Sequence, residues 1–527
     1  MSLNQIRGRL FGRNVSEVVF RAQPDEDLFI GELLVGIDEI TNRRYLIRVV
    51  DISYGSDQRE PLWAQRIAGR LLGDDSGGDE GFIEEHFLYE PSRRSYQIAE
   101  CRCLGYITPD ATSFQKPKSL PSQFSQVVSP EPSDFNFLAS RMGDLNIGNL
   151  RSGEQEVDFE VGISGNSFSS HIGIFATTGM GKSNLLQVLA AQVMLQQGRY
   201  GLLVIDPHGE HHQKLAQHPW ASSTLKIYSS RKAVPNASTL RVGLGELSID
   251  DLRVSYQWSH AQEEAIFELE RHYGKKGLSW LSEFCSIQDL SDFRENELSS
   301  RVAPATLQII HRRAKRITGL SIIASDSSIS VGDSIIRDLQ EGKVVVLDLS
   351  ALDSTEELMI ASYFSRRVLD EWSSQYLENP SKHSRMPVVG IVLEEAQRVL
   401  GNAKSKGEGN IFPRIAREGR KFKVGLCAIS QQPKLIDDEL LSQFNTFLIL
   451  GLSDEKDRNI LRSSAKQDLS ALSKEIQTLM PGEALVVNLE APFAIPAKIQ
   501  LFSQMIKHIE PLPIERKSPP NVSALMD

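Results

Sequence analysis

Cysteine is scarce in this chain and long apolar stretches are missing, and both absences narrow the class of protein. Only four cysteines occur in 527 residues, too few for the disulfide framework of a small secreted domain. Their spacing matches no zinc motif, so we expect buried free thiols. No run approaches the ~18 apolar residues that a membrane span needs, and the N-terminus has no secretory signal pattern. We therefore expect a cytoplasmic protein with no membrane contact.

An excess of positive charge is also lacking. The formal net charge is −10, whereas a small domain that binds nucleic acid is usually basic overall. Any contact with nucleic acid must therefore come from local basic patches and not from the global field. Hydrophobic residues at 40% and charged residues at 24% are typical of a folded protein.

Two regions of different pattern divide the chain. Residues 15–106 contain short runs rich in β-branched and aromatic residues, which predict a small barrel or sandwich. Five prolines in residues 107–134 favour an extended connection between domains. From residue 171, near-continuous apolar runs such as "YGLLVIDP", "KVVVLDLS", "PVVGIVLEE" and "EALVVNL" alternate with helical stretches. This alternation indicates an α/β fold with a parallel sheet that is covered by helices.

Residues 250–335 interrupt the alternation with helical patterns, and we interpret them as a helical insertion. The resulting domain prediction is an N-terminal β-barrel over 1–135, an α/β core in two parts, the insertion between them, and an extended C-terminal tail. The boundaries of the last four segments are 136–250 for the first core part, 251–338 for the insertion, 339–505 for the second core part and 506–527 for the tail.

A glycine-rich segment, "FATTGMGKSN", follows the apolar strand "IGIFA" and precedes a helical stretch over 183–197. Strand, glycine-rich turn and helix in this order form the phosphate loop of nucleotide-binding enzymes, because backbone amides and the helix N-terminus then point at the phosphates. Lys182 is placed to reach the β- and γ-phosphates, and the Ser183 hydroxyl to hold Mg²⁺. The predicted nucleotide-binding residues are Thr177, Thr178, Gly179, Met180, Gly181, Lys182, Ser183 and Asn184.

Carboxylates follow two other strands. Glu394 and Glu395 end "PVVGIVLEE", and we predict that Glu394 acts through the water shell of the metal while Glu395 is the general base that polarises the attacking water. Asp206 ends "LLVIDP", at the strand end that faces the ligand crevice of a parallel sheet, and is predicted to lie in the nucleotide site. The nearby His208, His211 and His212 have no companion ligand set in the sequence, so we interpret them as exposed loop histidines.

A basic block lies at residues 401–423, with seven Lys or Arg against two Glu. An arginine that is supplied by a neighbouring subunit can neutralise charge that develops on the γ-phosphate, and Arg417 and Arg420 are the candidates. Gln431, at the end of the next strand, is placed to sense the γ-phosphate or to position water.

Taken together, the motifs "FATTGMGKSN", "VIDPHGE", "IVLEEAQ", "IAREGRKFKVG" and "SQQPKLIDDELLSQFNTFLILGLSDEKD" resemble the HerA-like branch of the HerA/FtsK superfamily of hexameric DNA-pumping ATPases. The resemblance covers about residues 15–505. It implies a RecA-like P-loop core behind the barrel, a homohexamer that binds ATP and Mg²⁺ between subunits, and double-stranded DNA in the pore. It also implies an effector enzyme of nuclease or NADase type, encoded nearby and docked on the barrel.

Three positions depart from the family pattern. Ala176 stands at the first glycine of the phosphate loop, Gln397 where relatives often have histidine, and Gly451 where relatives often have arginine. Gln397 puts a link between ATP state and a DNA loop in doubt, and Gly451 an intersubunit contact. No catalytic group is removed, so hydrolysis is expected.

Three functions compete on these residues. The first is an ATP-driven translocase of double-stranded DNA that works with an effector. The second is a regulatory ATPase platform in a bacterial antiviral complex, which controls its effector without extensive DNA pumping. The third is a small-molecule phosphotransferase with the insertion as a lid, and the adjacent glutamates and the basic block argue against it.

Overall fold

The computed structural model describes residues 6–511 apart from 12–13, 24, 57–94, 109–112, 233, 257, 277, 289, 291–301, 326 and 402–408. The chain divides into two compact units, each assembled from several segments. Unit 1 comprises residues 1–182, 395–397 and 428–499. Unit 2 comprises residues 183–394, 398–427 and 500–527. The predicted domain boundaries stay predictions, and the predicted tail lies outside the described residues from position 512.

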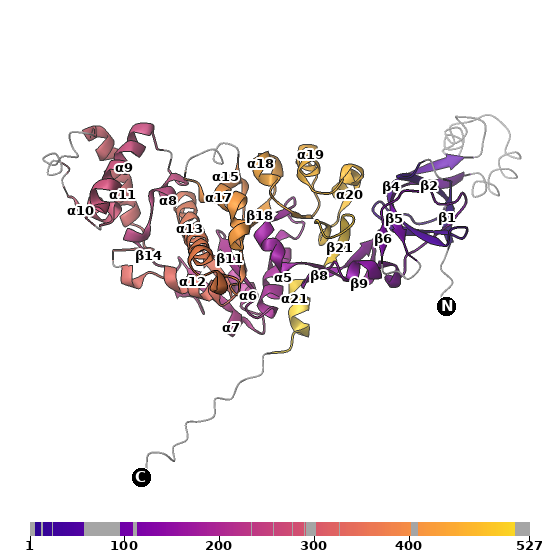
Figure 1. Cartoon of the computed structure of the whole chain (residues 1–527), viewed down its shortest axis with the longest axis horizontal. Helices are drawn as coiled ribbons and strands as arrows, with labels where there is room; N and C mark the ends of the chain where they lie inside the picture. Colours follow the sequence, from indigo (N-terminus) through magenta and orange to yellow (C-terminus); the bar gives the residue numbers. More distant parts are fainter. Residues whose placement is uncertain are drawn as a thin grey trace, which may run out of the picture. The chain divides into compact units, whose positions relative to one another are not determined.

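A closed β-barrel forms the N-terminal part of unit 1 (Figure 1). Its strands follow the order β2-β1-β7-β3-β4-β5, and β2 pairs with β5 to close the sheet, while the short β6 extends from β5. Alternate residues point inward to a core that includes Phe20, Leu34, Ile47 and Val127. The bounds are β1 (Ile6–Leu10), β2 (Glu17–Ala22), β3 (Leu33–Asp38), β4 (Arg43–Ser56), β5 (Ser95–Ile107), β6 (Phe114–Gln115) and β7 (Gln126–Val128). The predicted barrel is confirmed.

The proline-rich segment 107–134, for which we predicted an extended connection between domains, also supplies strands to the barrel. β7 lies within this segment and pairs antiparallel with both β1 and β3. The three-residue run Gln126–Val128 is too short to give a periodic signal, and the barrel needs it to join β1 to β3. Closure of a sheet depends on pairings between distant segments, which local sequence does not encode.

Unit 1 also contains six strands in the order β10-β19-β20-β21-β8-β9. β10 and β19 are parallel, whereas each later pair is antiparallel. The prediction that "EALVVNL" belongs to a parallel sheet is therefore wrong, because burial on both faces does not fix strand direction. The bounds are β8 (Leu145–Ser152), β9 (Gln155–Ile163), β10 (Ile172–Phe175), β19 (Thr446–Ile449), β20 (Glu483–Val487), β21 (Ile495–Ile499), α4 (Asn136–Ala139), α18 (Asp438–Leu441), α19 (Glu455–Ser464) and α20 (Ser473–Thr478).

A buried ionic cluster joins the barrel to these strands within unit 1. Glu475 of α20 lies 2.8 Å from the Arg151 guanidinium of β8 and 3.8 Å from that of Arg48 on β4. The Arg48 side chain is only 1% exposed, and burial lowers its pKa. Removing one partner of such a cluster leaves an uncompensated buried charge.

We expect Glu475→Gln to lower the free energy of unfolding by about 3–5 kcal/mol, because the amide no longer neutralises Arg48 and Arg151. Urea denaturation of the purified chain measures this. Glu341→Gln is the control, since the Glu341 side chain is exposed where it pairs with Lys343, and its loss should cost about 0–1 kcal/mol. Equal losses in the two variants would contradict the structural role of the cluster.

A parallel sheet with the order β13-β12-β16-β11-β17 forms the centre of unit 2. The four central strands are almost wholly buried, and the apolar runs predicted three of them, β11, β16 and β17. Their bounds are β11 (Tyr200–Asp206), β12 (Leu225–Ser229), β13 (Ser238–Thr239), β16 (Val344–Asp348) and β17 (Val388–Leu393). The strand β18 (Val424–Ser430) and the helices α5 (Lys182–Leu195) and α15 (Gln397–Leu400) contain residues of both units.

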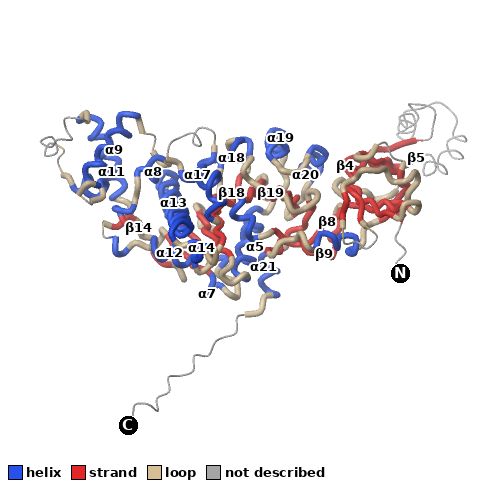
Figure 2. The backbone as a smooth tube through the Cα atoms, viewed as in Figure 1, coloured by secondary structure: helices blue, strands red, loops and turns tan. Residues whose placement is uncertain are grey.

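The predicted helical insertion is confirmed, and its helices pack on one another (Figure 2). α9 (His260–Gly274) and α11 (Pro304–Thr318) match the two helical patterns in the sequence, and α10 (Trp280–Ser286) contacts both. The remaining elements of unit 2 are α6 (His211–Leu215), α7 (Ala221–Thr224), β14 (Val242–Gly243), α8 (Ile249–Arg253), β15 (Ile323–Ala324), α12 (Gly332–Gln340), α13 (Ser354–Glu378), α14 (Pro380–His383), α17 (Ile411–Glu418) and α21 (Phe502–Met505). Across the described residues, the helices are too short or too polar to cross a membrane.

Candidate nucleotide site

The phosphate loop has the backbone geometry that a phosphate ligand requires. It connects the fully buried β10 to α5, and Gly179 and Gly181 adopt φ values of 84° and 102°. L-residues with a side chain rarely adopt such angles. Nothing lies within 4 Å of the position of a Cβ at Gly179, so the loop is open on that side. Ala176 is buried and has no positive φ, so the departure from glycine there imposes no backbone strain.

Backbone contacts within unit 1 hold the loop in place. The Thr177 amide donates to the Gly451 carbonyl, and the Gly482 amide to the Met180 carbonyl. The Lys182 Nζ donates to the carbonyl oxygens of Ala176 and Thr177, at 3.2 and 3.3 Å. The Lys182 ammonium group therefore lies against the phosphate loop, where a bound phosphate would also lie.

Gly451 explains one departure from the family pattern in physical terms. A Cβ at this position would come within 2.5 Å of the Met180 side-chain end and 3.1 Å of the Leu479 carbonyl. A longer side chain at 451 would therefore need Met180 to move. Glycine here lets the phosphate loop pack directly on the strand end.

Glu395 is held by hydrogen bonds from two glutamine side chains. Gln431 donates to its Oε1 at 2.9 Å and Gln397 donates to its Oε2 at 2.6 Å. Gln431 also accepts from the Thr178 hydroxyl of the phosphate loop at 2.5 Å, and Gln397 accepts from the Ser430 hydroxyl at 2.7 Å. The five side chains form a continuous hydrogen-bonded chain within unit 1, which connects the phosphate loop to the predicted general base.

The backbone at Glu395 is unusual, with φ at 49°. A non-glycine residue in this region costs on the order of 1–3 kcal/mol and persists where the surrounding structure fixes it. The sequence predicted Glu395, Gln431 and Thr178 as site residues, but it treated Gln397 only as a departure from the family pattern. Gln397 lies two positions from Glu395 in the sequence, and this proximity was a signal that could have identified it. The hydrogen bond itself could not be read from the sequence.

Asp206, His211 and Glu394 come together in unit 2, at the ends of β11 and β17. Asp206 accepts backbone amide hydrogens from Gly209, Glu210 and His211, and so fixes the turn after β11. The His211 Nε2 lies 2.8 Å from the Glu394 Oε1. Burial lowers the pKa of His211, but the Glu394 hydrogen bond and the charges of Glu394, Asp206 and Glu210 outweigh burial and raise it.

The interpretation of all three histidines as exposed loop residues is wrong for two of them. His208 is exposed, whereas His211 and His212 are buried at 0% and 2% exposure. The turn that Asp206 organises directs the chain into α6, and the first turn of this helix packs inward. Sequence gave no sign of this, because Glu394 lies 183 positions away.

These three residues have the donors and the spacing for a cation. One ligand atom from each of Asp206, His211 and Glu394 lies within 4.8 Å of the others. Carboxylate oxygens suit Mg²⁺, whereas an imidazole suits transition metals. The fit to Mg²⁺ thus rests on the two carboxylates, with His211 orienting Glu394. Ser183, the other predicted metal ligand, lies in the first turn of α5 directly after Lys182.

Asp348 and Arg231 are a second polar group in unit 2 that the sequence analysis missed. Asp348 ends β16, beside Asp206 on β11. It accepts hydrogen bonds from Ser229, Arg231 and Ser350, and these bonds lower its pKa although burial alone would raise it. The sequence "VVVLD" ends in this acidic residue, and a carboxylate at the end of an apolar run was the signal that could have identified Asp348.

The basic block separates into structural and exposed residues. Lys423 donates to three carbonyl oxygens at the end of α14 and Lys421 stacks on Tyr376, so both serve the fold. Arg414 pairs with Glu418 on α17. Arg417 and Arg420 are exposed and line an open hollow of about 630 Å³. Lys404 and Lys406 lie outside the described residues.

Asn184 has its side chain engaged away from the phosphate loop. Its amide donates to the Gln500 carbonyl at 2.9 Å and its oxygen accepts from the Phe502 amide at 2.9 Å. The side chain therefore caps α21 and anchors the C-terminal segment to α5. A role in nucleotide binding is left to the backbone of this residue.

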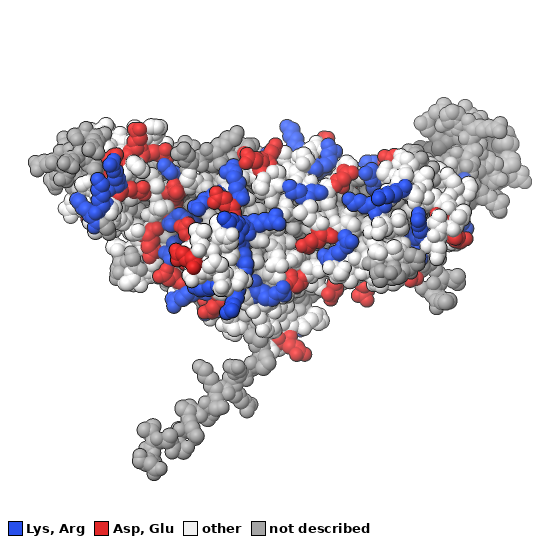
Figure 3. All heavy atoms as spheres, viewed as in Figure 1, with Lys and Arg blue, Asp and Glu red and all other residues white. Residues whose placement is uncertain are grey.

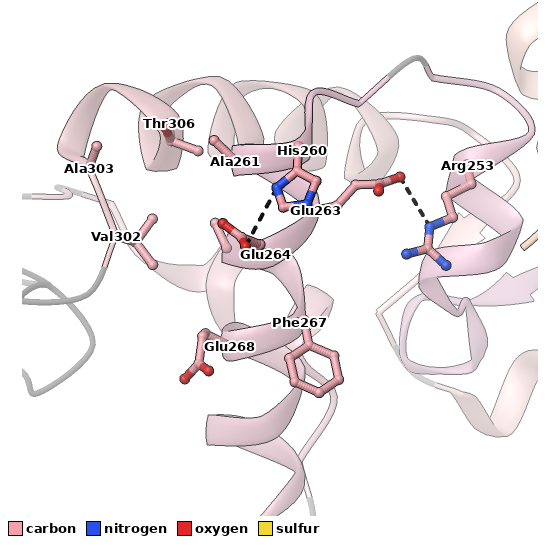
Figure 4. A pocket seen from close by; sticks show the side chains of 11 residues that line it. Arg253, His260, Ala261, Glu263, Glu264, Phe267, Glu268, Val302, Ala303 and Thr306 are labelled. Atoms are coloured by element: carbon pink, nitrogen blue, oxygen red, sulfur yellow. Dashed lines mark ion pairs between the residues drawn. The ribbon is translucent and has the colours of Figure 1, made fainter. Parts of the chain in front are cut away.

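A hollow of about 590 Å³ lies in the helical insertion (Figure 4), and none of the predicted site residues lines it. Glu263, Glu264 and Glu268 of α9 line it, and two of these carboxylates have partners in the lining, Glu263 with Arg253 and Glu264 with His260. An acidic wall repels phosphate groups. The hollow therefore gives no support to the insertion as a lid over a phosphorylated substrate.

Residues 145–368 match the family model described as "Helicase HerA, central domain". A protein of Saccharolobus solfataricus described as "DNA double-strand break repair helicase HerA" is 25% identical over 391 residues, 72% of this chain and 73% of its own length. The protein of the same description from Sulfolobus acidocaldarius is 26% identical over 477 residues, 88% of this chain and 90% of its own length. The structure of VirB4 of Thermoanaerobacter pseudethanolicus superposes with a TM-score of 0.47 at 17% identity, covering 68% of this chain and 96% of that one.

Proposed function

We propose that the chain is an ATP-hydrolysing motor that translocates double-stranded DNA, since residues 145–368 match the family model of the HerA central domain. The observation that carries this proposal is the hydrogen-bonded chain from Thr178 through Gln431 to Glu395. A protein that only binds a nucleotide needs a phosphate loop, but it needs no carboxylate connected to that loop by hydrogen bonds. A hydrolase needs both.

The residues divide the work as follows. Lys182 and the loop amides bind the phosphates of ATP, and Glu395 accepts a proton from water that Gln431 helps to place. Mg²⁺, when bound, neutralises phosphate charge, and Ser183 and Glu394 are the residues that would hold it and its water shell. Lys182 and Glu395 act on the phosphates and the water, whereas Ser183 and Glu394 act on the metal. Each residue of the first pair is next in sequence to one of the second, so the peptide bonds connect the two pairs directly.

The exposed arginines support a ring. The Arg420 guanidinium forms no ion pair or hydrogen bond with the residues that the structure describes, and it lies in an open hollow. An arginine without a partner in its own chain is available to the γ-phosphate of a neighbouring subunit. We infer a homohexamer in which Arg420 acts across the interface, and Arg417 is the alternative.

The barrel supports a docking role. Several of its large apolar side chains are exposed, among them Ile40 at 84%, Tyr54 at 80% and Phe124 at 68%. Exposed apolar groups that gather on one small domain mark interaction surfaces. We infer that an effector enzyme of nuclease or NADase type docks here, in DNA repair or antiviral defence. In the alternative function, the ring regulates this effector without extensive DNA pumping.

DNA dependence of ATP turnover tests the proposal. We expect linear duplex DNA to stimulate steady-state ATP hydrolysis by the purified full chain several-fold. Charges of both signs are interspersed on the face shown in Figure 3, so DNA contact should depend on local clusters of Lys and Arg. Binding should therefore fall steeply between 50 and ~200 mM salt, as counterion release predicts. Turnover that duplex DNA leaves unchanged, but that a co-purified neighbouring gene product alters, would favour the regulatory platform.

A further inference from the structure

A second hollow of about 590 Å³ lies within unit 1, where the barrel meets the strands that follow it. None of the phosphate-loop residues lines it. Its walls include β4, β5, β6 and the segment after it, the segments after α4 and α19, and the segment between β20 and β21. Segments that are far apart in the sequence therefore build one cavity, and its volume lies in the range of small-ligand sites.

The charge of this hollow is opposite to that of the chain. One carboxylate, Asp468, lines it together with five cationic side chains: Arg48, Arg102, Lys116, Arg141 and Lys466. In a chain of net charge −10, such a concentration of positive charge in a concave surface focuses the field on an anion.

Internal contacts neutralise only part of this charge. Arg102 lies 3.2 Å from Asp468. Arg141 and Lys466 donate to the backbone carbonyls of Glu490 and Ser442, and to no carboxylate in the part of the chain that the structure describes. Lys116 is exposed and makes no ion pair or hydrogen bond within the described part of the chain. Among the described residues, three of the cationic groups thus have no carboxylate partner.

Arg48 adds an independent observation at the floor of the hollow. It is 1% exposed, and its Nε is buried without a hydrogen-bond partner among the described residues, although its terminal nitrogens contact Glu475 and the Ala494 carbonyl. A buried donor without a partner is costly, and an anion in the hollow would add a second negative charge beside this guanidinium.

Two aromatic rings complete the lining. Phe114 and Phe493 have ring centroids 5.7 Å apart with their planes tilted at 58°, and the Arg48 guanidinium lies 5.8 Å from the Phe493 ring. Both rings are largely buried, at 8% and 7% exposure, so a flat ligand can meet only a small part of their surface. Inorganic phosphate would use the cationic groups alone, whereas a nucleotide would use both the cationic groups and the rings.

We propose that this hollow is a second nucleotide-binding site, for a phosphorylated nucleoside whose phosphates contact Lys116, Arg141 and Lys466 and whose base lies against Phe493. It is separate from the phosphate loop and is not a site of hydrolysis, because its one carboxylate is paired with Arg102. A ligand here would contact the barrel and the adjoining strands together, and so would stabilise their packing.

Equilibrium dialysis with ADP tests the proposal on the full chain. The wild-type protein should bind two ADP per chain, and Lys182→Ala should retain one. In the Lys182→Ala background, Lys116→Glu and Arg141→Glu should each weaken the remaining site at least tenfold, since each removes a charge-assisted contact. Lys118→Glu is the matched control, because Lys118 is exposed nearby and does not line the hollow. Phe493→Leu should weaken ADP but leave inorganic triphosphate unchanged.

Each other outcome overturns the proposal. No ADP bound to the Lys182→Ala protein, or equal affinity in the Lys116→Glu and Lys118→Glu proteins, removes the site. A short duplex DNA that displaces ADP from the Lys182→Ala protein, and binds in proportion to the ADP released, would make the hollow a DNA contact instead. In the Lys116→Glu chain with Lys182 intact, ADP binding reports on the phosphate loop alone. Failure of the second site can therefore be distinguished from failure of the proposed ATPase function.

Discussion

Glu395→Gln is expected to reduce steady-state ATP turnover by about 10²–10⁴-fold, the usual contribution of a general base, while ATP binding is retained. The amide that replaces the carboxylate cannot accept a proton from water. Gln431 and Gln397 each donate to one Glu395 oxygen, and a glutamine at 395 offers only one acceptor, so one of the two neighbours must turn its own amide. Turnover is measured by phosphate release, and binding by dialysis with ATP at low temperature.

The matched control for this variant is Glu378→Gln, at the exposed C-terminal end of α13. It removes the same charge from a glutamate remote in sequence from every predicted site residue, and turnover should not change. Unaltered turnover in the Glu395→Gln protein would show that Glu395 is not the base and would remove the main support for hydrolysis at this site.

Arg420→Ala is expected to lower ATP turnover by about 10³–10⁵-fold, the range for an arginine that acts on the γ-phosphate in trans. Because the Arg420 side chain is exposed on the short segment after α17, its removal should leave folding intact. Arg417→Ala is measured beside it and distinguishes the two candidates. Arg414→Ala is the control, since Arg414 is exposed in the same block but pairs with Glu418 of its own helix.

Mixed rings decide whether the arginine acts across an interface. Lys182→Ala and Arg420→Ala proteins should each be inactive alone, whereas a mixture that exchanges subunits should regain part of the activity. In the mixture, some intact Lys182 sites meet an intact Arg420 from the neighbour. A mixture that stays inactive although mass measurements show exchanged subunits would place Arg420 outside the nucleotide site, and a monomeric chain would remove the ring.

The residues that the sequence predicted well are those whose role depends on neighbours along the chain. The phosphate loop was predicted because strand, glycines, lysine and helix follow one another within about fifteen positions. The buried parallel strands of unit 2 were predicted because their apolar runs are nearly continuous. Glu394 and Glu395 were found because they end such a strand.

The residues that the sequence missed depend on pairings over long distances. His211 was assigned to the surface, yet it bonds to Glu394. The role of Gln397 appears only when its amide reaches the Glu395 carboxylate. The buried cluster of Arg48, Arg151 and Glu475 joins three segments that no local pattern relates.

By itself, the sequence determined the chemical groups available to this protein: a phosphate loop, a pair of glutamates and a basic block that contains Arg417 and Arg420. Those assignments follow from residue type, spacing and apolar period, which are properties of short segments. Only the tertiary structure decided which groups meet, because closure of the barrel by β7, the antiparallel direction of β20 and the contacts of His211 and Gln397 all depend on how distant segments pack. Packing is a collective property of the whole fold, and local propensity neither fixes nor reveals it.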